Sequence, residues 1–437
     1  MSTLLANKQI LYGSSTGYHY VIDSFLGAGT QGEVYKATCG QTVVAIKWYF
    51  PSYLESDPQL QQRLSNAIKK GSPNERFCWP LELVAQAEQN SFGYVMPLRP
   101  ESFKSIVDLM RRKAEPTFYT LMSSCIELAA SFLQLHAKGF CYRDINFNNV
   151  FFDAITGEIL ICDNDNVDIN GSEGVINGTP RFMAPELVRA DAQPNTETDL
   201  FSLAVLLFYM LMLHHPLEGK KEAAIRCFDQ AAMNKLYGTE PVFIFNPDDV
   251  SNAPVAGLHD NALTYWALYP QFIRDLFITS FTKGLINTQA RVRENEWRSA
   301  LIRLRDSILY CSCGAENFYD VNALQHGEDK VCWACAKSLI IPPRFRSDHA
   351  IVMLNHNTRL YAHHIDKTQR FVFDVPVAAI NRHPQDPERW GLQNLTTSAW
   401  TITTSDNQLK TVEPQRSVAL ASGVKIDFGN TVAEIRL

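Results

Sequence analysis

A glycine-rich loop followed by a strand that ends in lysine is the feature that most constrains how this chain folds. The loop reads Gly-Ala-Gly-Thr-Gln-Gly-Glu-Val and contains Gly27, Gly29 and Gly32. Glycine has no Cβ, so the backbone N–H groups of such a loop can approach phosphate oxygens closely. A dinucleotide-binding fold would continue directly into a helix, but the run Val44–Ile46 before Lys47 predicts a strand. A cation at the end of that strand can reach nucleotide phosphates, so this segment is a predicted phosphate site.

A second group of polar residues follows in the middle of the chain. Asp144 and Asn149 lie in the stretch Tyr-Arg-Asp-Ile-Asn-Phe-Asn-Asn, where the carboxylate can accept a hydroxyl proton and the amide oxygen can bind Mg²⁺. Asp163 ends the apolar, strand-like run Leu160–Cys162 and offers a second Mg²⁺ ligand. The string Ala-Pro-Glu, which ends at Glu186, comes next. One acidic loop is usually only a turn, but these elements in this order predict a phosphotransfer site.

With these motifs, residues from about 18 to 308 resemble a eukaryotic-type (Hanks-like) serine/threonine protein kinase. The resemblance implies that Lys47 holds the α- and β-phosphates of ATP. It implies that Asn149 and Asp163 bind Mg²⁺ or Mn²⁺, and that Asp144 orients a serine or threonine hydroxyl of a protein substrate. The nucleotide-binding set that the resemblance implies is Gly27, Gly29, Gly32, Val34, Ala45, Lys47, Met96 and Leu98.

A narrower resemblance concerns two longer strings. Leu160–Val167 and Asp199–Phe208 are similar to segments of a bacterial kinase subgroup encoded beside a von Willebrand factor A protein and a 2C-type phosphatase in tellurite-resistance-associated loci. This resemblance implies bacterial signalling or stress response, with those two proteins as partners besides the protein substrate. Arg291 resembles the late arginine that pairs with Glu186 in the family.

Several positions depart from the family pattern. No acid lies between Asp57 and Glu75, where the family's helix glutamate would pair with the strand lysine, and Asn146 stands where the family has a lysine. The metal motif reads Asp-Asn-Asp instead of Asp-Phe-Gly, so Asp165 and the nearby Asp168 add negative charge. We expect these two carboxylates either to repel ATP or to recruit extra divalent metal.

The departures leave three functions open. The first is an active serine/threonine kinase, the second a nucleotide-binding pseudokinase that acts as a scaffold, and the third a small-molecule phosphotransferase on the same fold. The strings Gly178–Pro180 and Ala184–Glu186 resemble those that build a platform for a polypeptide substrate. These strings argue against the third function, and we expect the first because Lys47, Asp144 and Asp163, the residues hardest to replace chemically, are all present.

Three residues are candidates for regulation. Arg143 lies beside the expected base, where its guanidinium could bind a phosphate group on the activation segment. Ser172 and Thr179 are the candidate phosphate acceptors, the alternative being ordinary loop residues.

Four cysteines lie close together in the sequence. Cys311 and Cys313 are separated by 18 residues from Cys332 and Cys335. Two pairs of thiolates at this spacing suit a tetrahedral Zn²⁺ ion, and Gly314 permits a tight turn behind the first pair. Free core thiols and disulfides are the alternatives. We predict a structural zinc ribbon over residues 309–342, since so short a module cannot build its own core.

The chain ends in a strand-rich region, residues 343–437, with short apolar runs between turn residues. The stretch Asn394–Gly429 resembles the latter half of a forkhead-associated domain, and an OB-like barrel is the alternative fold. Either one would be an interaction module. The predicted fold class is thus α+β: a bilobal kinase domain (1–308, N-lobe about 18–98, C-lobe about 99–308), a zinc ribbon and an all-β domain.

Composition and charge bear on the partners and the compartment. The formal net charge is −6, which argues against a nucleic-acid partner. The longest apolar run, Leu203–Leu213, is too short for a membrane span, and the N-terminus has no signal-peptide pattern. The six remaining cysteines are scattered singly, so we expect a reducing, cytoplasmic setting.

Overall fold

The computed structural model describes residues 3–86, 91–170, 178–320, 331–383 and 385–437, apart from the side chains of 387 and 388. The chain divides into two compact units, which we describe separately. The first unit contains Met1–Trp266 and Arg274–Arg298, and the second contains Ala267–Ile273 and Ser299–Leu437.

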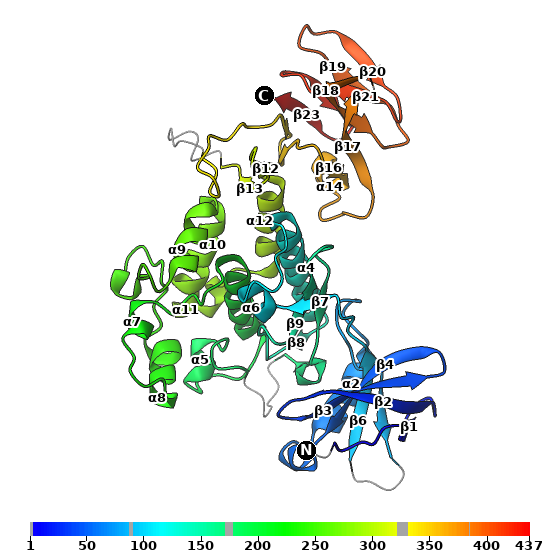
Figure 1. Ribbon diagram of the computed structural model, residues 1–437, viewed down its shortest axis with the longest axis vertical. Helices are drawn as coiled ribbons and strands as arrows, with labels where there is room; N and C mark the ends of the chain where they lie inside the picture. The colour runs from blue at the N-terminus through cyan, green and yellow to red at the C-terminus, as the bar shows by residue number, and fades with distance from the viewer. Residues whose placement is uncertain (1–2, 87–90, 171–177, 321–330, 384) are drawn as a thin grey trace. The chain divides into compact units, whose positions relative to one another are not determined.

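The N-terminal part of the first unit is a six-stranded barrel (Figure 1). Its strands are β1 (Ile10–Gly13), β2 (His19–Ala28), β3 (Gly32–Cys39), β4 (Thr42–Tyr49), β5 (Glu82–Ala85) and β6 (Phe92–Pro97). They follow the order β1-β2-β3-β4-β6-β5, and β1 closes the barrel by pairing with β5. The barrel therefore begins ahead of the N-lobe start expected near residue 18.

The alternation of side chains along β4 decides where Lys47 points. Val44, Ile46 and Trp48 belong to the core inside the barrel. Ala45 and Tyr49 point to the opposite face, as alternation requires, and pack against a separate apolar cluster. Lys47 lies between these last two residues in the sequence and so shares their face.

Two helices lie between β4 and β5, namely α1 (Pro51–Ser56) and α2 (Leu60–Lys70). Helix α2 is amphipathic, and Leu60 and Leu64 pack in the same cluster as Ala45 and Tyr49. The face of β4 that carries Lys47 is therefore covered by α2.

The rest of the first unit is mainly helical. Its elements, with the helices that reach the second unit, are β7 (Phe103–Ser105), α3 (Ile106–Met110), α4 (Phe118–Ala137), β8 (Phe140–Cys141), β9 (Val150–Asp153), β10 (Ile159–Ile161), η1 (Asn164–Asn166), β11 (Asp168–Ile169), α5 (Pro185–Val188), α6 (Thr196–Met212), α7 (Lys220–Ala223), α8 (Gln230–Met233), η2 (Asn234–Thr239), η3 (Val250–Asn252), α9 (Asp260–Leu268), α10 (Gln271–Phe281), α11 (Lys283–Ile286), η4 (Thr288–Ala290) and α12 (Glu294–Asp306). The division between the units falls inside α12, ahead of the boundary expected at 308.

Helix α6 forms the centre of this helical part. It contains most of the apolar run Leu203–Leu213, and every residue from Thr198 to Met212 is buried. Asn195 caps its first turn by accepting hydrogen bonds from two backbone N–H groups. The run is thus a core helix, as predicted. Among the described residues one helix, α4, is long and apolar enough to cross a membrane, and 61% of its most apolar window is buried inside the protein.

The second unit contains a β hairpin, the cysteine cluster and two antiparallel sheets. Its elements are β12 (Ile308–Tyr310), β13 (Glu316–Phe318), β14 (Arg344–Arg346), β15 (Ile351–Met353), β16 (Arg359–Tyr361), α14 (Ala362–Ile365), β17 (Pro376–His383), β18 (Asp386–Asn394), β19 (Trp400–Thr403), β20 (Leu409–Val412), β21 (Ser417–Ala419), β22 (Lys425–Asp427) and β23 (Val432–Arg436).

The two sheets of this unit share one apolar core. The larger has the order β15-β14-β23-β22-β19-β20 and the smaller the order β16-β17-β18-β21. Phe345 and Ile426 come from the larger sheet, Leu360 and Leu392 from the smaller, and all four lie in one cluster. The β region predicted from the sequence is therefore present as two sheets around a common core, and its likeness to a forkhead-associated domain stays a prediction.

Candidate active site

Lys47 is the centre of an ion-pair cluster. Its side chain is only 5% exposed, and Nζ lies 2.8 Å from Asp165 Oδ2 and 3.3 Å from Asp163 Oδ1. Nζ also donates a hydrogen bond to Gln31 in the glycine loop. Burial disfavours the charged form, but the charges of Asp165 and Asp163 outweigh it and raise the pKa of the Lys47 amine. The lysine is therefore a buried cation held by two carboxylates.

Asp165 supplies the acidic partner of Lys47 that the sequence did not identify. Its carboxylate is 1% exposed, and Tyr49 donates a hydrogen bond of 2.6 Å to Asp165 Oδ2. Helix α2 has the sequence Leu-Gln-Gln-Arg-Leu-Ser-Asn-Ala-Ile-Lys-Lys and carries no acid. Within the fold, the partner of Asp165 is Lys47, and the expectation that Asp165 repels ATP or recruits extra divalent metal stays a prediction.

Asp168 is balanced in a similar way. Its Oδ2 lies 3.3 Å from an Nη atom of Arg143 and 3.8 Å from Nε of Arg63 on α2. Arg63 also makes two hydrogen bonds to the carboxylate of Asp57, at 2.8 and 2.5 Å. A chain of alternating charges, Asp57–Arg63–Asp168–Arg143, therefore connects the start of α2 with the loop that precedes Asp144.

Asp144 is held by three polar side chains. Thr179 Oγ1 donates a hydrogen bond of 2.8 Å to Asp144 Oδ1, and Asn149 Nδ2 donates one of 3.2 Å to Oδ2. Asn146 Nδ2 donates to the Asp144 carbonyl and to Thr179 Oγ1, both at 3.1 Å. Burial raises the pKa of Asp144, although these hydrogen bonds to the carboxylate oppose the rise. A carboxylate with a raised pKa in this setting is suited to accept a proton.

The loop that carries Asp144 is fixed from beneath by α6. Asp199, in the first turn of α6, accepts hydrogen bonds from the backbone N–H groups of Tyr142 at 2.5 Å and Arg143 at 2.9 Å. His136 lies between Asp199 and Glu294 and makes hydrogen bonds to both. Burial alone would lower the pKa of His136, but the two acids raise it to about 9. The histidine is therefore a cation at neutral pH, and it neutralises the buried acid that holds the loop.

The two expected metal ligands are neighbours. The backbone N–H of Cys162 donates a hydrogen bond of 2.8 Å to the carbonyl of Asn149, which brings Asp163 beside that residue. Asn149 uses its amide nitrogen on Asp144, so its oxygen is the atom available to a cation. The Asp163 side chain is 42% exposed. A carboxylate and an amide oxygen are the hard ligands that Mg²⁺ requires, and this pair fits the ion.

The expected nucleotide-binding residues gather in two places. Val34, Ala45, Met96 and Leu98 share one apolar cluster, which also contains residues of α2 and β10. The glycine loop connects β2 to β3, and a Cβ on Gly32 would lie 2.2 Å from the carbonyl oxygen of Trp48. Glycine is therefore required there by close packing against β4. Ser172 lies outside the described residues.

The ion pair between Arg291 and Glu186 that the resemblance implies is confirmed. Arg291 makes two hydrogen bonds to Glu186, at 2.7 and 2.8 Å, and its side chain is 1% exposed. Arg291 also donates to the carbonyls of Gly284 and Glu197. The pair therefore connects α5 with the helices that follow it.

Comparison with protein families decides the classification. A family model described as "Protein kinase domain" matches residues 20–246, just over half of the chain.

The chain belongs to the protein kinase family.

Curated relatives of this chain are named as protein kinases, several of them as serine/threonine-protein kinases. Serine/threonine-protein kinase PknD of Chlamydia abortus is 26% identical over 237 residues, which cover 46% of this chain and 25% of the relative. The probable serine/threonine-protein kinase MARK-C of Dictyostelium discoideum is 26% identical over 216 residues, covering 47% of this chain and 27% of the relative. Protein kinase C delta type of Mus musculus is 33% identical over 110 residues, covering 24% and 15%. The chain thus spans about a quarter or less of each relative.

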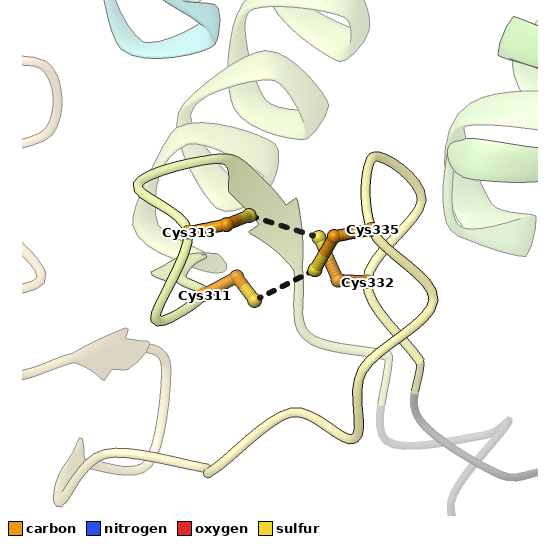
Figure 2. A group of neighbouring side chains, drawn as sticks. All are labelled: Cys311, Cys313, Cys332 and Cys335. Atoms are coloured by element: carbon orange, nitrogen blue, oxygen red, sulfur yellow. Dashed lines mark hydrogen bonds between the residues drawn. The ribbon is translucent and has the colours of Figure 1, made fainter.

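A cluster of four cysteines lies beyond the part of the chain that matches the kinase family. Figure 2 shows the thiols of Cys311, Cys313, Cys332 and Cys335 turned toward one another from two loops. The sulfur atoms of Cys311 and Cys335 are 3.6 Å apart, and those of Cys313 and Cys332 are 3.7 Å apart. All four ligand atoms lie within 4.8 Å of one another. A tetrahedral Zn²⁺ site has sulfur–sulfur edges of about 3.8 Å, so the cluster fits this ion.

The state of the cysteines bears on the two alternatives to a zinc site, free thiols and disulfides. All ten are free thiols, so the disulfide alternative for the cluster is excluded. Gly314 has a φ of +90°, which makes the tight turn after Cys313 possible. Asn317 Nδ2 lies 3.6 Å from the sulfur of Cys332, as expected for an outer group that orients a thiolate ligand.

Proposed function

We propose that this protein is an ATP-dependent serine/threonine protein kinase that transfers the γ-phosphate to a serine or threonine hydroxyl of a protein substrate. The observation that carries this proposal is the assembly of Lys47, Asp163, Asn149 and Asp144 in one site, with Asp165 in contact with the lysine. Asp165 thereby supplies, beside Lys47, the negative charge that a glutamate on helix α2 would otherwise supply.

Each side chain then has a role that suits its surroundings. Lys47 binds the α- and β-phosphates, and Asn149 and Asp163 hold the Mg²⁺ that neutralises the nucleotide. Asp144 accepts the proton of the substrate hydroxyl while the oxygen forms its bond to the γ-phosphorus and ADP leaves. Catalysis rests on positioning and charge neutralisation. The apolar cluster with Ala45 and Met96 receives the adenine base.

One observation favours the second candidate, a nucleotide-binding scaffold without transfer. Lys47 Nζ already contacts Gln31, Asp163 and Asp165, so it must exchange a partner to bind phosphates. A bacterial signalling or stress-response role, a cytoplasmic location, and a von Willebrand factor A protein and 2C-type phosphatase as partners also belong to the proposal. These rest on the resemblance stated above.

Transfer of label from γ-labelled ATP tests the function. We expect the wild type, with Mg²⁺ or Mn²⁺, to label itself or a generic acceptor protein, and Asp144→Asn to lose this labelling. Glu127→Gln is the matched control, because Glu127 pairs with Arg76 in another ion-pair group. Folded wild type that transfers no label with either metal would favour the scaffold.

We further propose that the four cysteines hold one structural Zn²⁺. Its binding energy would stabilise a loop region that has little core of its own. A closed site with four thiolates leaves no position for a substrate, so the ion has no catalytic role here.

A further inference from the structure

The segment that follows the metal ligand Asp163 carries two acids, and each has an arginine or lysine of the catalytic site as its partner. Asp165 contacts Lys47 at 2.8 Å, and Asp168 contacts Arg143 at 3.3 Å. Both cations are buried, with side chains 5% and 2% exposed. These two pairs therefore hold Lys47 and the arginine that directly precedes Asp144.

The turn at Asp163 and the hydroxyl of Tyr49 fix the position of Asp165. It lies in the short helical turn η1, directly after Asp163, whose φ of +53° turns the chain sharply. The Tyr49 hydroxyl fixes Asp165 Oδ2 from the strand that also carries Lys47. The contact between lysine and acid thus joins β4 to η1, and α2 supplies neither of the two groups.

Helix α2 contributes a cation in this region instead of an acid. Arg63 is 10% exposed and pairs with Asp57, with Asp168 further away at 3.8 Å. Besides its apolar packing, α2 thus has a charged contact with the site through Asp168.

Arg143 has its counter-charge already in the fold. The sequence suggested that this arginine binds a phosphate group on the activation segment, but its guanidinium contacts Asp168. Asp168 opens β11, which pairs with β8, and its register partner is Cys141, close to Arg143 in the chain. The backbone pairing holds the Asp168 carboxylate against Arg143, the residue expected to bind a phosphate group.

We propose that Asp165 and Asp168 are positioning residues that hold Lys47 and Arg143 in their working places, so that this kinase site is assembled without a helix carboxylate and without an activation-segment phosphate. The inference rests on the proposed kinase function. It predicts an enzyme whose activity does not depend on phosphorylation of the segment between Asp168 and Glu186.

The first test compares Asp165→Asn and Asp168→Asn with the control Glu127→Gln. We expect Asp165→Asn to raise the KM for ATP and lower kcat, and Asp168→Asn to lower kcat with little change in KM, with losses in kcat/KM of about 100-fold. Tyr49→Phe removes one hydrogen bond to Asp165 and gives a milder loss of the first kind. Thermal melting shows that the variants are folded. Variants that retain wild-type kcat and KM would overturn the proposal.

A second test uses the chemistry of the lysine and needs no kinase activity. An N-hydroxysuccinimide ester acylates lysine amines that it can reach, and mass spectrometry measures the rate at Lys47. Asp165→Asn removes the nearest carboxylate that holds this buried amine in place, so we expect the variant to be acylated about tenfold faster than wild type at the same pH. Equal rates would refute the pairing of Asp165 with Lys47. Wild type that transfers no phosphate would refute the proposed function, yet this rate would still report on the pair.

The third test concerns phosphate. The wild type is treated with a serine/threonine phosphatase until intact mass shows no phosphate, and its initial rate is then measured. We expect kcat to change by less than about twofold. A loss of tenfold or more that autophosphorylation restores would show that Asp168 does not replace an activating phosphate.

Discussion

Thr179 Oγ1 donates a hydrogen bond of 2.8 Å to Asp144 Oδ1, and Asn146 Nδ2 lies 3.1 Å from the same threonine oxygen. The threonine precedes the Ala-Pro-Glu string, which belongs to the predicted substrate platform, and Asp144 is the predicted base. This contact therefore connects the segment that would receive the substrate with the group that would accept its proton. Asn146 holds the two together from the position where the family has a lysine.

The first prediction concerns this contact. Thr179→Val removes the hydroxyl that orients Asp144, so we expect kcat to fall about tenfold or more while the KM for ATP stays within about twofold of wild type. Thr179→Ser keeps the hydroxyl and should retain most of the activity. Steady-state kinetics at saturating acceptor protein measure both values. Equal activity of the valine variant and wild type would show that the hydroxyl has no positioning role.

The second prediction concerns the pH dependence of kcat. Asp144 accepts a proton only when it is ionised, so activity must fall as the pH drops through its pKa. Burial raises that pKa above the ordinary aspartate value of about 3.9. Thr179→Val removes a hydrogen bond that lowers the pKa, so its acid limb should lie at higher pH than that of wild type. Coincident acid limbs in the two proteins would contradict this assignment.

The third prediction concerns stability. The pKa of His136 is raised to about 9, above the ordinary value of about 6.5. The protonated His136 therefore contributes about 3 kcal/mol to the free energy of unfolding. This contribution is fully present below about pH 6.5 and is lost as the pH rises through about 9. Urea unfolding at several pH values should show this decline in wild type and not in His136→Gln. The same decline in both proteins would rule out His136 as its source.

The fourth prediction concerns the buried pair of Arg291 and Glu186. Arg291→Met leaves Glu186 without its bidentate partner, and we expect a loss of about 3 kcal/mol in the free energy of unfolding. Arg189 and Asp191 form a far more exposed pair, so Arg189→Met should cost less than about 1 kcal/mol. Chemical denaturation of both variants gives the comparison. Equal losses would mean that the burial of the first pair is energetically unimportant.

The fifth prediction concerns metal. We expect about one Zn²⁺ per chain by elemental analysis. Cys332→Ser should lose the ion and melt at a lower temperature, and a chelator should have the same effect on wild type. Cys227 is exposed and lies apart from the cluster in the sequence, so Cys227→Ser should retain both the ion and the melting temperature. Purified wild type without zinc, and unable to bind added zinc, would leave the cluster as free thiols.

The sequence motifs were informative where the chemistry depends on a short string of residues. Three such strings are the glycine loop, the strand before Lys47 and the loop around Asp144. Each can be found from a few consecutive residues, because close backbone approach, strand alternation and a proton acceptor have local sequence patterns. The cysteine spacing likewise predicted that the four thiols lie together, which the structure shows, and the bound zinc stays a prediction. The sequence also predicted α6 as a buried helix from its apolar run, and the pairing of Arg291 with Glu186 from the resemblance.

Apart from Arg291 and Glu186, pairings between distant residues had no such signal. Asp165 is an ordinary acid in the sequence, and its role follows from the turn that brings it to Lys47 while Tyr49 fixes it. His136, Asp199 and Glu294 were not identified as one group, because three helices must pack before the charges meet.

The sequence by itself thus determined the family, and it predicted the residues of the candidate site, since both follow from local strings and their spacing. The tertiary structure decided which acid balances which cation. Lys47 pairs with Asp165 instead of a helix glutamate, and Arg143 pairs with Asp168. The physical reason is that a buried charge requires a partner within a few ångströms, and only the folded chain fixes which carboxylate is that close.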